Sequence, residues 1–276
     1  YGISNQLGKT KESNAKEILQ YALNQGINVL DTAPSYGNSE DIIGGFIHNH
    51  PCDECWRIIT KTPNFKSSVI SDKQIDKLFE SFELSQNKLG KKNIYGLLVH
   101  ECDNIFLPGG KKILDKMNQL KDDGFIKKIG VSVYSGEQID RLLDNYAVDL
   151  VQLPINILDQ RLLNGGQLSK LKQHGVEIHA RSVFLQGLLL MPLNSVHPWF
   201  DPILRVLGEF HIKAKKLQPD VIVDYVREAY ISNISNMRIT FDKKLRTGLY
   251  NTDIFDKQAP TVDVIEKPLH VLEIKY

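Results

Sequence analysis

Asp31, Tyr36, Lys61 and His100 form a set of side chains that could together deliver a proton to a carbonyl oxygen. A phenol alone, with a pKa of about 10, is a poor proton donor near neutral pH. A nearby ammonium group favours the phenolate, so we expect Lys61 to lower the pKa of Tyr36 and Asp31 to hold Lys61 in place. A histidine beside the phenol can orient the oxygen of a ketone or an aldehyde. Together the four groups could protonate that oxygen while a reduced nicotinamide delivers hydride.

Three of these residues end short apolar runs, and three further runs end in the same way, at Ser132, Gln152 and Arg181. Amphipathic, helix-like stretches closed by glycine separate the runs. Regular alternation of strands and helices demands a parallel sheet, and the single series of polar strand ends favours a closed barrel over an open doubly wound sheet. Such strand ends surround one mouth of a barrel, where polar residues are catalytic rather than structural. The sequence therefore predicts an α/β fold with a closed barrel of parallel strands.

The amino-acid composition indicates an ordinary globular protein. The chain has 276 residues, of which 42% are hydrophobic and 24% charged, and its net charge is +1. These values are typical of a globular protein without an electrostatic footprint for nucleic acid or membranes. No apolar stretch is long enough to span a membrane, and no signal peptide precedes the first element. Three cysteines favour the reducing cytoplasm over a disulfide framework. Because the chain starts at Tyr1 without a Met, we expect a fragment.

The pattern changes after about residue 217. The segments VIVDYVREAY, NMRITFD and LHVLEIKY are strand-like, partly alternating, and separated by Asn, Asp, Gly and Pro. This is typical of antiparallel β structure. We therefore predict two domains, a barrel over residues 1–217 and a β-rich segment over residues 218–276.

Residues 1 to about 217 resemble the aldo-keto reductase family. The resemblance is carried by DTAPSYGNSE (31–40), ITK (59–61) and GLLVH (96–100). The family's Asp-Tyr-Lys-His tetrad falls, in order, on Asp31, Tyr36, Lys61 and His100. The resemblance implies a (β/α)8 barrel that uses NADPH, less often NADH, to reduce a small carbonyl compound, with Tyr36 as the general acid.

The same resemblance implies a cofactor site. The family holds the nicotinamide carboxamide with a Ser-Asn pair and a Gln; Ser132 and Gln152 match, whereas Val133 stands at the Asn position. Arg181 stands where the family commonly stacks a tyrosine on the nicotinamide ring, and a planar guanidinium could stack instead. The segments ARSVFLQG and PINILDQR add further implied contacts, to the cofactor at Ser182, Gln186 and Gly187 and to the substrate at Asn156.

Two departures from the family concern the ends of the barrel. Family barrels have a strand before the YGI segment, and an eighth strand with a loop that binds the cofactor phosphate. We expect the first and eighth strands to be missing here, which would leave an incomplete barrel with two unpaired edges.

The C-terminal segment resembles the middle strands of the VTC polyphosphate-polymerase domain through YVREAY, MRITFD and VLEIKY. That resemblance implies phosphate binding by Arg227, Arg238 and Lys275; solvent-facing or edge-protecting basic residues are the alternative.

Two other patterns favour structural explanations. HNHPCDEC (48–55) combines histidines with Cys-x-x-Cys, as zinc or redox sites do, but a loop between helix and strand commonly collects polar residues, and we predict no metal. GGKK (109–112) lacks the spacing and the terminal Ser or Thr of a phosphate loop.

Two hypotheses of function follow. The first is NADPH-dependent reduction of an aldehyde, ketone or sugar-derived carbonyl, with a small molecule as partner and neither nucleic acid nor membrane; the oligomeric state stays open. The alternative is a truncated or fused protein without reductase activity, whose C-terminal β segment binds polyphosphate or nucleotide phosphates. A third hypothesis combines the two, with the β segment packing over the open barrel edges.

Overall fold

The computed structural model describes residues 10–50 and 55–209, and beyond them the backbone of strands within residues 223–231, 238–248, 261–263 and 271–275. The chain divides into two compact units, residues 1–198 and 199–276. The boundary predicted at residue 217 lies outside the described residues. No helix in the described part of the chain is long and apolar enough to cross a bilayer.

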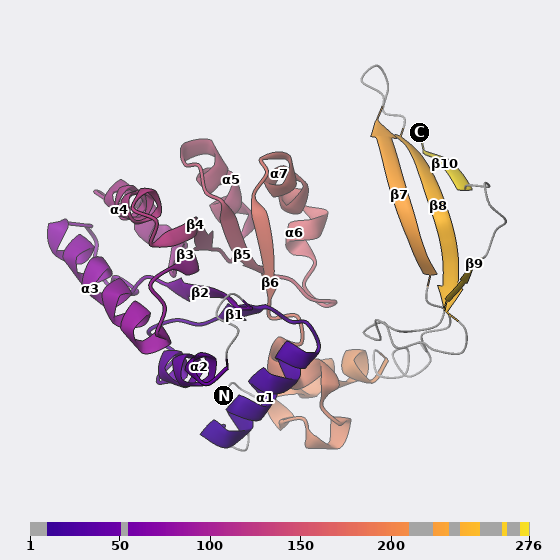
Figure 1. The fold of residues 1–276 in the computed structure, drawn as a ribbon, viewed down its shortest axis with the longest axis horizontal. Helices are drawn as coiled ribbons and strands as arrows, with labels where there is room; N and C mark the ends of the chain where they lie inside the picture. Colours follow the sequence, from indigo (N-terminus) through magenta and orange to yellow (C-terminus); the bar gives the residue numbers. More distant parts are fainter. Residues whose placement is uncertain are drawn as a thin grey trace. The chain divides into compact units, whose positions relative to one another are not determined.

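A sheet of six parallel strands forms the centre of the first unit and curls into a half-barrel with helices on its outer side (Figure 1). Each strand pairs with the next one along the chain, so the order is β1-β2-β3-β4-β5-β6. This confirms the predicted incomplete (β/α)8 architecture. The strands are β1 (Val29–Asp31), β2 (Arg57–Lys61), β3 (Ile94–Val99), β4 (Ile126–Ser132), β5 (Leu150–Pro154) and β6 (Glu177–Arg181).

Helices alternate with these strands as the periodicity of the sequence predicts. The α-helices are α1 (Glu12–Asn24), α2 (Ser39–His48), α3 (Asp72–Leu89), α4 (Lys111–Asp122), α5 (Gly136–Asn145), α6 (Arg161–Asn164) and α7 (Gln167–Gln173). The 3-10 helices are η1 (Cys102–Phe106), η2 (Leu185–Leu190), η3 (Leu193–Ser195) and η4 (Pro198–Ile203).

Helix α3 shows how local sequence sets the ends of these elements. Ser71 and Gln74 form a capping box that satisfies backbone N–H groups at its start. Gly90 closes it in the left-handed region, at φ 63°, which a residue without a Cβ adopts at little cost. Between these ends, Leu78 and Phe82 are buried one turn apart, so the helix presents one apolar face.

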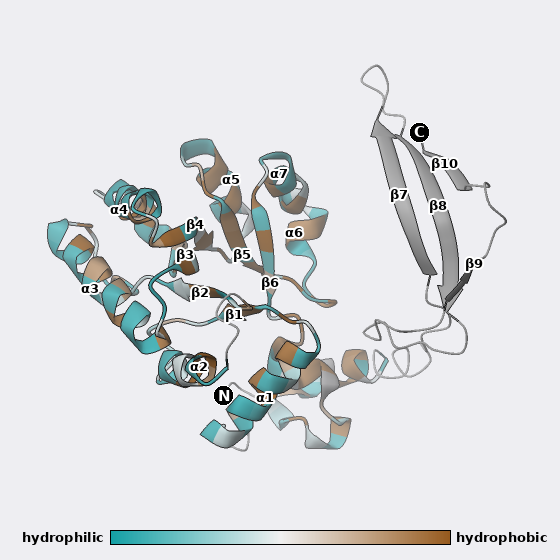
Figure 2. Cartoon of the chain, in the orientation of Figure 1, coloured by the Kyte–Doolittle hydropathy of each residue, from teal (hydrophilic) through white to brown (hydrophobic). Residues whose placement is uncertain are grey.

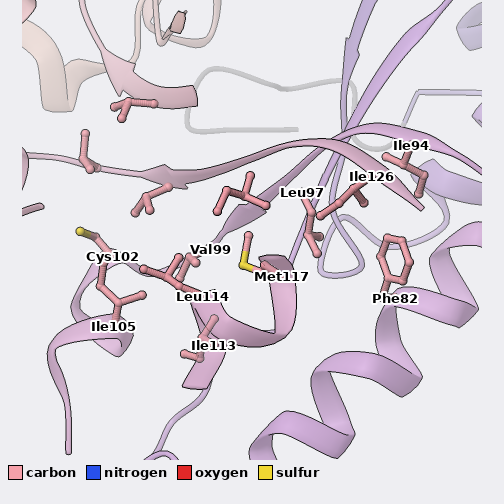
Figure 3. Close-up of a cluster of buried hydrophobic side chains, with 14 of the residues drawn as sticks. Phe82, Ile94, Leu97, Val99, Cys102, Ile105, Ile113, Leu114, Met117 and Ile126 are labelled. Carbon is pink, nitrogen blue, oxygen red and sulfur yellow. The ribbon is translucent and has the colours of Figure 1, made fainter. Parts of the chain in front are cut away.

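The main core lies between the helices and the outer face of the sheet. Figure 3 shows part of it, where Phe82 of α3 and Met117 of α4 lie near side chains of the strands, such as Leu97. Hydrophobic residues dominate β5, whereas the helices carry both kinds (Figure 2). Each large apolar side chain buried in this way contributes roughly 1.5–3 kcal/mol. The outer face therefore holds the half-barrel together.

The concave face of the sheet has a smaller apolar cluster formed by Ile59, Leu98 and Leu150. Since side chains alternate between the two faces of a strand, the residues two positions further along share this concave face. Those residues are Lys61, His100 and Gln152. The concave face therefore carries an apolar layer and, at the carboxyl ends of the strands, a polar layer.

An ionic network lies on the other side of the apolar layer, at the amino ends of the strands. The Glu177 carboxylate accepts a hydrogen bond from the Tyr95 hydroxyl at 2.8 Å, contacts the Lys128 ammonium, and lies 2.6 Å from Nε2 of His179. Burial acts to raise the pKa of Glu177, but hydrogen bonds from Lys128, His179 and Tyr95 outweigh it and lower that pKa to about 2. The network ties β3, β4 and β6 together.

The second unit contains an antiparallel sheet, as predicted from the change of pattern after residue 217. Strand β8 (Arg238–Gly248) pairs with β7 (Val223–Ile231), β9 (Thr261–Asp263) and β10 (Val271–Lys275). The prediction included the segments of β7, β8 and β10 but missed β9, which has only three residues.

Candidate active site

The carboxyl ends of neighbouring strands bring three members of the predicted tetrad to one place. Asp31 and Lys61 are the last residues of β1 and β2, and His100 directly follows β3. Tyr36 lies in the turn between β1 and α2, where its backbone N–H donates to the Ala33 carbonyl at 2.9 Å. The fold thus positions all four groups at the same edge of the half-barrel.

A buried ion pair forms the base of the site. Nζ of Lys61 donates to Oδ1 and Oδ2 of Asp31, at 2.7 and 2.8 Å, and to the Thr32 carbonyl at 2.9 Å. The Lys61 side chain is 1% exposed, whereas that of Asp31 is 36% exposed. Nε2 of Gln152 donates to Oδ1 of Asp31 at 2.8 Å. The carboxylate therefore orients both the ammonium group and the amide.

Tyr36 lies over this ion pair. Nζ of Lys61 is 4.9 Å from the centre of the Tyr36 ring, and the Tyr36 and His100 rings meet edge to face with centres 6.0 Å apart. The structure therefore brings the phenol, the ammonium, the carboxylate and the imidazole together.

The pKa of Tyr36 is raised, the opposite of the expected direction. Burial is the largest cause, followed by the negative charge of Asp31 and by Tyr134, and the Arg181 guanidinium opposes them. The expectation considered only the ammonium of Lys61. In the folded protein that ammonium is paired with Asp31, so its field at the phenol is offset and desolvation prevails. Tyr36 is therefore a protonated phenol at neutral pH.

His100 is poised as a neutral hydrogen-bonding group. Burial lowers its pKa, the positive charges of Lys61 and Arg181 lower it further, and Asp31 acts in the other direction. Its backbone N–H donates to Oγ1 of Thr62 at 3.2 Å. Nδ1 of its ring is buried and has no hydrogen-bond partner among the described residues. An unpaired buried ring nitrogen is costly unless a ligand completes its hydrogen bonding.

The predicted nicotinamide residues fall at the same edge. Ser132 is buried at the end of β4, beside Gln152 in the register of β4 and β5. Arg181, at the end of β6, places Cζ 4.0 Å from the centre of the Tyr134 ring, and its Nη2 donates to the Val133 carbonyl at 3.2 Å. One face of the guanidinium is therefore covered by a tyrosine of the chain itself.

The segment after β6 is strained. Ser182 and Gln186 have positive φ angles of 59° and 57°, next to Gly187 at 92°. Left-handed backbone costs a residue with a Cβ about 1–2 kcal/mol, and strain of this kind clusters at binding sites. The predicted cofactor residues of this segment thus lie in a loop whose shape is imposed by its surroundings.

The Asn156 side chain, which was predicted to contact the substrate, forms hydrogen bonds within its own turn. Its Oδ1 accepts hydrogen bonds from the backbone N–H groups of Leu158 and Asp159, at 2.9 and 3.0 Å. The side-chain oxygen shapes its own turn, in the manner common for asparagine. Contact with a substrate stays a prediction for this residue.

The sequence reasoning missed three residues of the site: Thr32, Thr62 and Tyr134. Thr32 and Thr62 immediately follow Asp31 and Lys61, so their adjacency could have indicated them. Tyr134 lies two positions beyond Ser132, and the sequence contains no signal of its contact with Arg181.

The other predicted site residues lie elsewhere. Arg227, Arg238 and Lys275 lie in β7, β8 and β10 of the second unit. Of the HNHPCDEC segment, Cys52 lies outside the described residues and Cys55 is disulfide-bonded, so the Cys55 sulfur is no thiolate ligand. Within the described residues, no cluster of three or more His, Cys, Asp or Glu side chains could hold a metal ion.

Comparison with known proteins places both parts of the chain. The aldo/keto reductase family model matches residues 1–194, and the VTC domain model matches residues 164–276. Aldo-keto reductase YhdN of Bacillus subtilis is 31% identical over 159 residues, which cover 56% of this chain and 47% of that protein. The NADH-specific methylglyoxal reductase of Escherichia coli is 27% identical over 59% of this chain and 54% of its own length. The chain therefore spans about half the length of these curated relatives.

Solved structures agree with the fold. The glycerol dehydrogenase AKR11B4 of Gluconobacter oxydans superposes with a TM-score of 0.57 at 25% identity, covering 78% of this chain and 72% of that one. The holo form of aldo-keto reductase AKR11C1 of Bacillus halodurans gives a TM-score of 0.59 at 24% identity, over 73% of this chain and 69% of its own. With a family model over residues 1–194 and the tetrad assembled at one edge, the chain belongs to the aldo-keto reductase family.

Proposed function

We propose that the chain reduces an aldehyde, ketone or sugar-derived carbonyl with NADPH, and that Tyr36 is the general acid. One observation carries the proposal: Nζ of Lys61, paired with Asp31, lies 4.9 Å from the centre of the Tyr36 ring, and the His100 ring meets the Tyr36 ring edge to face at 6.0 Å. Membership of the family supports carbonyl chemistry in general, and the relatives whose names state an activity act on methylglyoxal and D-arabinose.

The residues at the edge suit a nicotinamide cofactor. Ser132 is buried at the end of β4, and Nε of Arg181 is buried without a hydrogen-bond partner among the described residues. Ser132, Gln152, Arg181, Ser182, Gln186 and Gly187 would hold the cofactor, which supplies hydride when bound.

Each member of the tetrad has a distinct role in the proposal. Tyr36 is a protonated phenol at neutral pH, and its raised pKa makes it a weaker acid until a carbonyl oxygen is in place to take the proton. Lys61 then stabilises the phenolate that remains, and Asp31 holds Lys61 in position. His100 donates a ring N–H to the carbonyl oxygen and fixes its orientation. General acid catalysis of this kind contributes roughly 100- to 10,000-fold in rate.

Replacing Tyr36 by Phe tests the proposal. We expect NADPH oxidation with small aldehydes to fall by about 100-fold or more, because the proton donor is lost. Tyr146→Phe is the matched control, since its hydroxyl donates to the Ile105 carbonyl away from the tetrad. Binding of NADPH, followed by its fluorescence, should change little in either variant. Equal rates for Tyr36→Phe and wild type would refute the role of Tyr36.

A second function is favoured by the strand register of the second unit. Arg238 of β8 pairs with Lys275 of β10, and Asp242 of β8 pairs with Arg227 of β7. Directly paired residues share a face, as do residues two apart on a strand. The three predicted basic residues therefore occupy one face of the sheet. This supports the alternative hypothesis, a segment that binds polyphosphate or nucleotide phosphates.

A titration with fluorescently labelled polyphosphate tests this alternative on the whole chain. If the sheet face that carries Arg227, Arg238 and Lys275 binds polyphosphate, a variant with these three residues replaced by Gln should lose most of the affinity. Replacing three exposed lysines of the first unit, Lys111, Lys112 and Lys127, by Gln removes the same charge and should change the affinity little. Equal losses in both variants would indicate non-specific attraction.

A further inference from the structure

Arg181 is a cation of the site without an anionic partner. Its Nη2 donates to the neutral Val133 carbonyl, and its guanidinium face rests on the Tyr134 ring. It forms no ion pair with a carboxylate of the described residues. Its Nε is buried without a hydrogen-bond partner there. A buried guanidinium edge with an unused donor is suited to an anionic acceptor.

The charges of the tetrad leave this cation uncompensated. The Lys61 ammonium is neutralised by Asp31, at 2.7 and 2.8 Å. His100 is neutral near pH 7, since burial and the neighbouring cations lower its pKa. The charge of Arg181 lowers the pKa of both Tyr36 and His100, so it acts on the position where the carbonyl group would lie. The tetrad and Arg181 together thus carry one surplus positive charge.

We propose that Arg181 is a specificity-determining residue that binds a carboxylate of the substrate, so that the site selects carbonyl compounds bearing one carboxylate. This inference rests on the proposed reductase function. Tyr134 covers one face of the guanidinium and Val133 accepts from Nη2, so a ligand would bind through the remaining in-plane N–H donors. A planar guanidinium binds a carboxylate through two parallel hydrogen bonds, and one carboxylate charge matches the surplus charge of the site.

A carboxylate on the substrate does not change the carbonyl reduction of the proposed function. A bound nicotinamide cofactor would supply the hydride that the carbonyl carbon receives, and the proton of Tyr36 goes to the carbonyl oxygen. The product is a hydroxy acid that retains its carboxylate, and the oxidised nicotinamide leaves. Arg181 takes no part in the transfers; beside its proposed contact with the cofactor, it positions the substrate.

A pair of aldehydes of similar size tests the inference: succinic semialdehyde, which bears a carboxylate, and butanal, which does not. We expect wild type to have the higher kcat/KM for the charged aldehyde. Arg181→Met should lower the ratio of kcat/KM for the charged aldehyde to kcat/KM for butanal by about 10- to 100-fold, the loss of a charge-assisted hydrogen-bonded pair; any effect through the cofactor lowers both values alike and leaves this ratio unchanged. Arg181→Lys keeps the charge and should lose less. Arg161→Met is the control, because Arg161 is exposed and paired with Asp159.

Two outcomes would overturn the inference. One is an unchanged preference between the aldehydes in Arg181→Met. The other is a large rise in the KM for NADPH in that variant with the preference intact, which would assign Arg181 to the cofactor alone. Failure of the proposed function is distinguished by binding: succinate should perturb the His100 ring resonances in wild type but not in Arg181→Met. Perturbation without turnover would retain the carboxylate site and refute the reductase; no perturbation and no preference would refute the carboxylate site.

Discussion

Replacing Asp31 by Asn should cost more stability than replacing Lys61 by Met. Two unit charges 2.7 Å apart attract each other by about 6 kcal/mol at an effective dielectric constant of about 20, before desolvation is subtracted. Removing one partner of a buried pair costs about 3–5 kcal/mol, because the other charge stays buried and unpaired. The Asn oxygen still accepts a hydrogen bond from Lys61, so we expect a loss of about 2–3 kcal/mol for Asp31→Asn.

The two partners differ because their exposure differs. The Lys61 side chain is 1% exposed and cannot reach water when Asp31 is neutralised. The Asp31 side chain is 36% exposed and keeps its hydrogen bond from Gln152, so in Lys61→Met the carboxylate is hydrated in place. We expect Lys61→Met to cost about 1 kcal/mol, since Met also fills much of the space of the lysine stem. The double variant should cost less than the sum of the single variants.

Urea unfolding followed by tryptophan fluorescence measures these free energies. The chain has two tryptophans, Trp56, which is buried in the first unit, and Trp199, which belongs to the second. A Trp199→Phe background makes the signal report the first unit alone. If Lys61→Met is as destabilising as Asp31→Asn, or if the double variant equals the sum of the single variants, the argument from exposure is wrong.

Two further predictions concern the scaffold. Gly44→Ala should destabilise the first unit by about 1–3 kcal/mol, because a Cβ there would lie 2.0 Å from the Lys88 carbonyl oxygen, whereas Gly45→Ala, with nothing within 4 Å, should be neutral or stabilising in the same urea assay. Since folding lowers the pKa of Glu177 from 4.5 to about 2, Glu177 contributes stability above pH 4.5 that is lost as the pH falls through this window. Urea midpoints at about pH 6 and about pH 3 should therefore differ less in Glu177→Gln than in wild type; an equal difference would exclude this contribution.

Much of the fold could be predicted because the signals that specify it are local. Apolar runs of strand length and amphipathic stretches closed by glycine alternate along the first unit, and that alternation admits little besides a parallel sheet. The same runs end at Asp31, Lys61, Ser132 and Gln152, so the sequence also indicated which residues share an edge. Strand β9 escaped prediction because three residues give no measurable periodicity.

The arrangement inside the site depends on distances between residues remote in the chain. Gln152 was expected to bind the cofactor, yet its Nε2 donates to Asp31, 121 positions away. The pKa of Tyr36 was expected to fall beside Lys61 but rises, because burial and the pairing of Lys61 with Asp31 outweigh the ammonium. The pKa of a side chain depends on every charge near it and on how far water is excluded from it. Both depend on residues that are remote in the sequence.

The sequence by itself determined the order of strands and helices, the edge where the tetrad assembles, and the antiparallel pattern of the last strands. The sequence also led us to expect the pairing of Asp31 with Lys61; only the tertiary structure decided how far each charge is buried and what surrounds Arg181. Asp31 is paired with Lys61, and Arg181 is supported by the Tyr134 ring without a carboxylate. The physical reason is that periodicity is a property of neighbouring residues, whereas charge balance and desolvation are properties of the folded volume.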